Sequence, residues 1–170
     1  LDLSDNSINE ISALAACTQL KELHLQHNAL TSVQSLSGLK ELTVLDVSSN
    51  SLTSVAPIFN NVRLNTLDIS SNKLSDLSGI GRLTELTGLS CAYNSITACD
   101  ALAGCTELVT LDISNNALAT MDGLDTLVNM TDLNLSYNSV VLVPAFPKDC
   151  ALKNVDASHH ALEDVSGFAG

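Results

Sequence analysis

The sequence predicts an α/β solenoid, in which the chain winds through successive coils that each contribute one short parallel strand. Two observations carry this prediction. Asparagine recurs every 22 residues with no insertion or deletion, at Asn6, Asn28, Asn50, Asn72, Asn94, Asn116 and Asn138. Around each asparagine, apolar residues occupy the same places of the repeating unit. Because a fixed period of roughly 20–50 residues is the signature of repeat architectures, this pattern favours stacked coils over a single globular core.

Each unit combines two hydrophobic periods. With positions counted from Leu1, positions 1 and 3 are apolar around a polar position 2, which is the alternation of a half-buried strand. Positions 8, 11, 14, 17 and 20 are mostly apolar in steps of three, which suits a tight turn, a short 3₁₀ segment or one or two helical turns. We therefore expect eight strands at positions 1–3, paired in parallel about 4.8 Å apart, with wider return paths outside that make the sheet concave.

The asparagine column has a structural explanation. Where the chain leaves each strand, buried backbone groups without sheet partners must find other hydrogen bonds. Asparagine offers an acceptor and two donors, so a ladder of these side chains is predicted to join each coil to the next. His160 stands at the eighth place of the column and is expected to replace asparagine there.

The chain is predicted to be one solenoid over residues 1–170, with seven complete units and a partial eighth. Both ends lack the polar cap that a terminal repeat requires, so we expect the sequence to be part of a longer protein. In the seventh unit Pro144 and Pro147 occupy the return path. Proline removes a backbone donor and blocks helix, which predicts an extended segment there.

Composition excludes several classes of partner. The chain has 7 basic and 19 acidic residues and a net charge of −12, whereas nucleic-acid binding needs clustered Lys and Arg. No apolar run approaches the ~20 residues of a membrane helix. We therefore expect neither nucleic acid nor membrane as a partner.

The five cysteines show no metal-binding spacing. Four of them, Cys17, Cys91, Cys99 and Cys105, occupy positions that are otherwise mostly apolar. The pattern favours buried reduced thiols and hence a cytoplasmic location, with association with the cytoskeleton left open. A disulfide or metal site is the alternative for the thiols.

Catalytic motifs are not found. The sequence has no GxSxG, HExxH or phosphate-binding loop. The histidines form two pairs, His24 with His27 and His159 with His160, which stacking would place about 29 Å apart. We predict that the chain is not an enzyme and that it holds no cofactor or metal.

The candidate binding surface is the face of the sheet that points away from the core. Positions 22, 2, 4 and 5 are expected to face solvent; of these 31 places eight are acidic and none is Lys or Arg. Such a face would steer a protein with a basic contact surface toward itself. Asp46, Asp68 and Asp112 are the candidate acidic contacts, and the alternative is that these carboxylates are only solvated.

Position 5 supplies the remaining candidate contacts. Tyr93, Tyr137 and His27 share this column, and exposed tyrosine is a frequent hot-spot residue in interfaces. The alternative is that the rings pack along the turn and cover the asparagine ladder.

The repeat LxLxxNxLxxIxxLxxxxxLxx resembles the leucine-rich repeat family over the whole chain, in its 22-residue subfamily, which includes the leucine-rich regulatory subunit of protein phosphatase 1 and the bacterial internalins. The resemblance implies a right-handed curved solenoid with a concave parallel sheet used for protein binding, without catalysis. The phosphatase regulator suggests acidic and aromatic concave contacts, and the present columns supply acids and two tyrosines but no Trp or Phe. Internalin-like proteins usually lack core cysteines.

The predicted function is a non-catalytic protein–protein interaction module, either a scaffold or a regulatory subunit, that presents an acidic concave face. One alternative is a structural component of a cytoskeletal or ciliary assembly that docks through its convex side or ends. Another is the recognition arm of an enzyme whose catalytic domain lies outside this chain.

Overall fold

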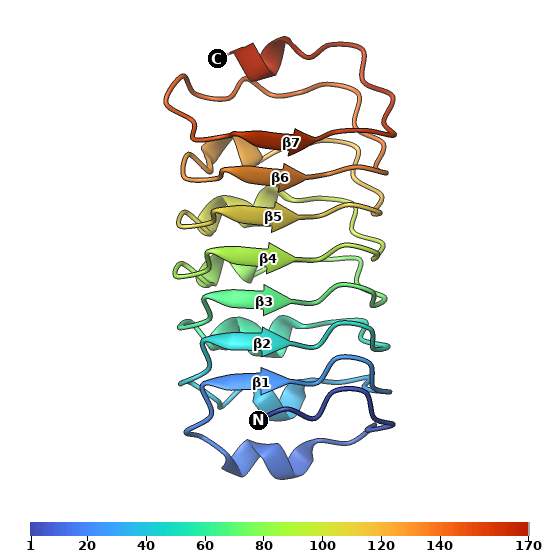
Figure 1. Cartoon of the computed structure of the whole chain (residues 1–170), viewed down its shortest axis with the longest axis vertical. Helices are drawn as coiled ribbons and strands as arrows, with labels where there is room; N and C mark the ends of the chain where they lie inside the picture. Colours follow the sequence, from blue (N-terminus) through green and yellow to red (C-terminus); the bar gives the residue numbers. More distant parts are fainter. Residues whose placement is uncertain (170) are drawn as a thin grey trace.

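The computed structural model describes residues 1–169 as a stack of coils with one parallel sheet along its length (Figure 1). The sheet has seven strands, and each strand pairs with the strand of the next coil in sequence order. The strands are β1 (Glu22–His24), β2 (Val44–Asp46), β3 (Thr66–Asp68), β4 (Gly88–Ser90), β5 (Thr110–Asp112), β6 (Asp132–Asn134) and β7 (Asn154–Asp156). The predicted solenoid with a parallel sheet is confirmed.

The strands begin one residue earlier than the sequence pattern predicts. They occupy positions 22 to 2 of the unit, so that residues 22 apart face each other, as Leu23 faces Leu45. The first unit contributes an isolated bridge from Asp2 to His24 in place of a strand, which leaves seven strands where eight were predicted.

The return paths contain short 3₁₀ segments, one of the alternatives that the steps of three allowed. These segments are η1 (Ser12–Ala16), η2 (Gln34–Leu36), η3 (Ala56–Asn60), η4 (Ile80–Arg82), η5 (Asp100–Gly104), η6 (Leu124–Thr126) and η7 (Ser166–Ala169). The seventh coil, all of it within the described residues, has no 3₁₀ segment around Pro144 and Pro147, as the prolines predict.

The coil is right-handed. In Figure 1 all strands run in one direction across the front, the 3₁₀ segments lie behind them, and the chain climbs from the N-terminus to the C-terminus. This is the hand that parallel strands joined by a crossover adopt almost always.

The core lies between the sheet and the return paths. Its side chains come from the apolar positions of the unit, and Leu45, Leu67 and Leu111 at position 1 are all at most 2% exposed. Such complete burial stabilises the fold by about 1.5–3 kcal/mol for each leucine. Each coil supplies one layer of this core, so most of the burial is between neighbouring coils.

The cysteines divide into two groups. Cys91, Cys99 and Cys105 are buried free thiols, and burial raises the pKa of Cys99 to about 12 and that of Cys105 to about 11. They therefore behave as small apolar residues. The prediction was wrong for Cys17, which lies in the first coil of the stack and is exposed.

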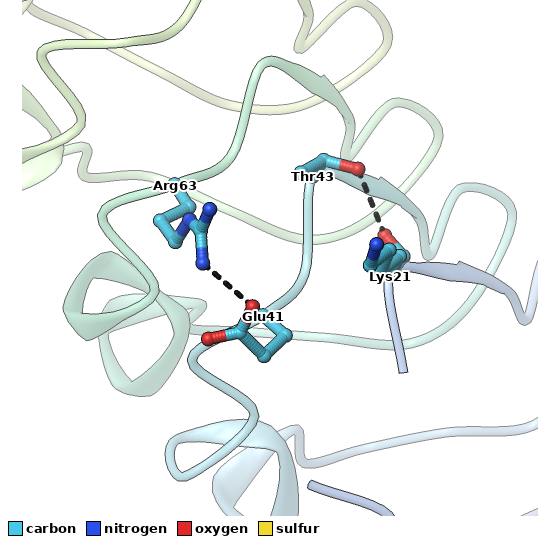
Figure 2. Close-up of polar contacts among 4 residues, drawn as sticks. All are labelled: Lys21, Glu41, Thr43 and Arg63. Carbon is cyan, nitrogen blue, oxygen red and sulfur yellow. Dashed lines mark hydrogen bonds and ion pairs between the residues drawn. The ribbon is translucent and has the colours of Figure 1, made fainter. Parts of the chain in front are cut away.

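Polar contacts join neighbouring coils just before the strands (Figure 2). The Thr43 hydroxyl donates to the backbone carbonyl of Lys21, 22 residues earlier, at 3.1 Å. Arg63 pairs with Glu41 at 2.6 Å, with both side chains substantially exposed, so this ion pair contributes at most about 1 kcal/mol. Within residues 1–169, the helical segments all fall short of the length and apolar character that spanning a bilayer would require.

Candidate functional site

The asparagine column lies beside the sheet, where each coil turns away from its strand. Asn72 Nδ2 donates to the carbonyls of Ile69 (3.2 Å) and Ser70 (3.1 Å) in its own coil and of Val47 (3.1 Å) in the preceding coil. Asn72 Oδ1 accepts from the Leu52 N–H at 2.9 Å. The same four contacts recur at Asn28, Asn50, Asn94, Asn116 and Asn138. The column thus bridges every pair of successive coils from the first to the seventh.

The two ends of the column differ from its middle. Asn6 is exposed and donates only within its own coil, to Leu3 and Ser4. His160 Nδ1 accepts from the Val140 N–H at 3.1 Å, and Nε2 lies 2.6 Å from the Leu135 carbonyl. With its proton on Nε2, the neutral histidine makes both contacts to the preceding coil that asparagine makes elsewhere.

Position 5 adopts a left-handed backbone conformation in every coil. Its φ angle lies between 51° and 57° at Asp5, His27, Ser49, Ser71, Tyr93, Asn115, Tyr137 and His159. Non-glycine residues rarely occupy this region, and β-branched residues are true outliers there. The absence of Val, Ile and Thr from this column is a sequence signal for this turn, which was not predicted above.

The turn at position 5 corrects one expectation about the exposed face. Position 4 was predicted to face solvent, but Ser48, Ala92, Ser114 and Ser136 are buried, with exposures of 3–9%. The residue that follows each of them has the left-handed backbone conformation. The sheet face is therefore less open than predicted in these four coils, whereas the other position-4 residues within the described chain are half-buried or, at Ser158, exposed.

The predicted position-5 contacts lie on this exposed edge. Tyr93 and Tyr137 are 61% and 52% exposed, and His27 is also exposed. Tyr137 stacks on His159 with ring centroids 4.0 Å apart and an angle of 12° between the planes. One tyrosine thus packs along the column, as the alternative interpretation proposed, yet half of its surface still faces solvent.

The aspartates at position 2 have a local role that the sequence analysis missed. Asp46, Asp68 and Asp112 each accept a hydrogen bond at Oδ1 from the backbone N–H two residues later, at 2.9–3.0 Å. Such Asx turns are a common way for aspartate to end a strand. The repeated Asp-x-Ser sequence was the available signal.

The pKa values of the aspartates at position 2 shift in opposite directions at different strands. Burial, with added repulsion from Asp46 and Asp112, raises the pKa of Asp68. Hydrogen bonds from Ser158 lower the pKa of Asp156, which is exposed. Of these two carboxylates, the one penalised by burial lies on β3 and the exposed one lies on β7.

A trough of about 780 Å³ runs along the sheet face from β3 to β7. Its acidic lining residues are Asp68, Asp112, Asp132 and Asp156, and Lys153 is the single basic residue among those that line it within the described chain. Asn154 donates to Asp132 at 2.6 Å, so this carboxylate is already partnered. The trough brings together Asp68 and Asp112 of the predicted contacts, whereas Asp46, Tyr93, Tyr137 and His27 lie outside its lining.

The family model described as leucine-rich repeats (two copies) matches residues 1–38, 40–82 and 84–126. These matches cover most of the sequence, and the chain belongs to the leucine-rich repeat family. A search of curated protein sequences finds no match.

Solved structures of several leucine-rich repeat proteins share the fold. An internalin from Listeria monocytogenes is similar with a TM-score of 0.84 and 26% identity, over 97% of this chain and 55% of its own. A leucine-rich repeat protein of Leptospira interrogans gives 0.72 and 23% identity, over 94% of this chain and 48% of its own. The ectodomain of the Arabidopsis thaliana receptor kinase GASSHO1/SCHENGEN3 gives 0.81 and 22% identity, over 99% of this chain and 25% of its own. The chain thus spans about half the length of the internalin and of the Leptospira protein, and a quarter of the receptor-kinase ectodomain.

Proposed function

We propose that this chain is a non-catalytic protein-binding module whose sheet face receives a partner with a basic contact surface. The observation that carries the proposal is the charge of that face. Asp46, Asp68 and Asp112 stand in one column, and the single basic residue lining the trough, Lys153, lies at the β7 end. A face with one sign of charge attracts and orients a partner of the opposite sign.

The family and its structures support a binding role. The receptor-kinase ectodomain was solved in complex with Casparian strip integrity factor 2, so a solenoid of this fold presents a surface to another molecule in that case. A role as scaffold or regulatory subunit belongs to this proposal. The buried free thiols of Cys91, Cys99 and Cys105 support a reducing, intracellular compartment.

Affinity capture with quantitative mass spectrometry tests the proposal. The chain is compared with a variant in which Asp68→Asn, Asp112→Asn, Tyr93→Ala and Tyr137→Ala are combined. We expect the partner to be lost from this variant and its binding to the parent to weaken with salt, since exposed charges are screened. A partner that binds the variant as well as the parent contradicts the proposal.

A matched control carries the same kinds of change in the segments that lie between the 3₁₀ segments and the strands. Glu85→Gln, Glu107→Gln, Val62→Ala and Val128→Ala remove two carboxylates and two exposed apolar side chains away from the sheet face. This variant should retain the partner. If it loses the partner while the sheet-face variant keeps it, docking through the convex side, as in a structural assembly, replaces the present proposal.

A further inference from the structure

The sheet face has a gap in its middle strand. At position 22, Gly88 of β4 lies between Thr66 of β3 and Thr110 of β5 in register. A Cβ atom at Gly88 would stand 3.3 Å from Thr110 Oγ1 and 4.0 Å from Thr66 Oγ1. The Thr110 hydroxyl thus lies closer to that place than neighbouring atoms usually do, so the two threonines narrow the space over the glycine, which has no side chain of its own.

Two carboxylates border the same gap. At position 2, the small Ser90 of β4 lies between Asp68 and Asp112 in register. These two aspartates are two strands apart, which corresponds to about 9.6 Å between their backbones. The Oδ1 atom of each accepts from the backbone N–H two residues later.

The hollow is therefore lined by acceptors on two sides. Its floor is Gly88 and Leu89, and its walls carry the hydroxyl groups of Thr66 and Thr110 and, toward position 2, the Asp68 and Asp112 carboxylates. The nearest basic residue of the trough, Lys153, lies three strands away at the β7 end. Burial already raises the pKa of Asp68, so a cation arriving there would relieve an unfavourable charge.

Resting on the proposed function, we propose that the hollow over Gly88 and Ser90 receives one arginine side chain of the protein partner. The gap is one strand wide, which matches one side chain. Guanidinium presents five donors in a planar fork and suits carboxylates that stand on opposite sides, whereas the lysine ammonium is a compact point charge. Charge complementarity and the missing side chain together favour arginine.

The test uses a defined probe, N-acetyl-arginine amide, titrated into the ¹⁵N-labelled chain and followed by NMR. We expect the Gly88 and Ser90 amide signals to shift, and the neutral isostere N-acetyl-citrulline amide to leave them in place. N-acetyl-lysine amide should bind more weakly than the arginine probe. Equal shifts from the lysine probe would overturn the choice of arginine, and no shift from the arginine probe would overturn the inference itself.

Filling the hollow without changing charge gives the decisive variant. Gly88→Thr places at β4 the residue that β3 and β5 already carry, and it should weaken arginine binding about tenfold, the loss expected when a charged hydrogen-bonded contact is denied. If Gly88→Thr disturbs the strand, Gly88→Ala is used instead, because alanine occupies less of the hollow. The matched control is Gly38→Thr, since a Cβ at Gly38 meets no atom within 4 Å, and it should bind like the parent.

Two further variants separate the hollow from general acidity. Asp112→Asn and Asp46→Asn remove the same charge and keep the Oδ1 acceptor, but only Asp112 lines the trough. Asp112→Asn should weaken binding more than Asp46→Asn. If the two weaken it equally and Gly88→Thr has no effect, the hollow is not the site, although the acidic face of the proposed function remains. If the capture experiment also finds no role for the sheet face, the proposed function fails with it.

Discussion

The central coils and the last two coils follow the same pattern but differ in how completely it is satisfied. Leu111 at position 1 of β5 is 2% exposed, whereas Val155 at the same position of β7 is 38% exposed. Asn94 makes four hydrogen bonds in the ladder, and His160 makes two. The difference shows that a residue's contribution here depends on having a coil on each side, because each coil packs mainly on its neighbours.

The largest expected effect comes from the core. Leu111→Ala should lower the free energy of unfolding by about 2–5 kcal/mol, since it leaves a cavity between two covering coils. The corresponding deletion at the same position of β7, Val155→Ala, removes a side chain that is 38% exposed and should cost about 1 kcal/mol or less. Urea unfolding of both variants measures the difference, and equal losses would mean that the end is packed as tightly as the centre.

The ladder should show the next largest effect. Asn94→Ala leaves half-buried backbone groups unpaired and should cost about 1–3 kcal/mol. Asn6→Ala is the control, because Asn6 is exposed and bonds only within its own coil, and its effect should be much smaller. The midpoints of thermal unfolding distinguish the two variants. An unchanged midpoint for Asn94→Ala would contradict the prediction that the hydrogen bonds of Asn94 stabilise the fold.

Substitutions at His160 test whether asparagine can form the ladder hydrogen bonds in the last coil as it does in the central coils. His160→Ala removes the acceptor of the Val140 N–H and should cost about 1 kcal/mol, with faster hydrogen exchange of that amide. His160→Asn supplies the acceptor and donor that the asparagines of the second to seventh coils use. Hydrogen exchange of the Val140 amide should therefore be as slow as in the parent or slower. Faster exchange in the asparagine variant than in the alanine variant would show that the histidine ring is required for its shape.

The smallest expected effect comes from removing a carboxylate charge at position 2. The change in stability at pH 7 should have opposite signs for Asp68 in the centre and Asp156 near the end. The folded-state pKa of Asp68 is raised, chiefly by burial, so ionisation opposes folding as pH rises through that pKa. Asp68→Asn keeps the Oδ1 acceptor and should stabilise the chain at pH 7 by less than about 1 kcal/mol, since solvent screens a partly exposed carboxylate. The gain should disappear toward pH 3.

Asp156 has a lowered pKa because Ser158 donates to it. Its ionised form contributes stability above the unfolded-state pKa, and this contribution is lost as pH falls through the folded-state pKa. Asp156→Asn should therefore destabilise the chain at pH 7 relative to pH 3. Thermal midpoints of both variants from pH 3 to 7 check the two signs, and a shared sign would contradict the difference between centre and end.

Part of the candidate site was predictable from the sequence, since Asp68 and Asp112 of the predicted contacts line the trough. The acidic column and the exposed tyrosines could be assigned because an unbroken 22-residue period places residues 22 apart side by side. The Asx turns were not predicted, because they depend on how the backbone bends after each strand. The hollow over Gly88 was not predicted either, since a single glycine becomes a gap only when the threonines of both neighbouring strands stand in register beside it.

The sequence by itself determined the parallel stack of coils, its core positions and its asparagine column, because a periodic pattern with no insertion allows one register between neighbours. Only the tertiary structure decided which polar positions face solvent. Next to the left-handed turn at position 5, position 4 is buried in four coils, while position 2 is mostly half-buried along the trough. That outcome follows from backbone direction at the end of each strand, which the hydrophobic pattern does not encode.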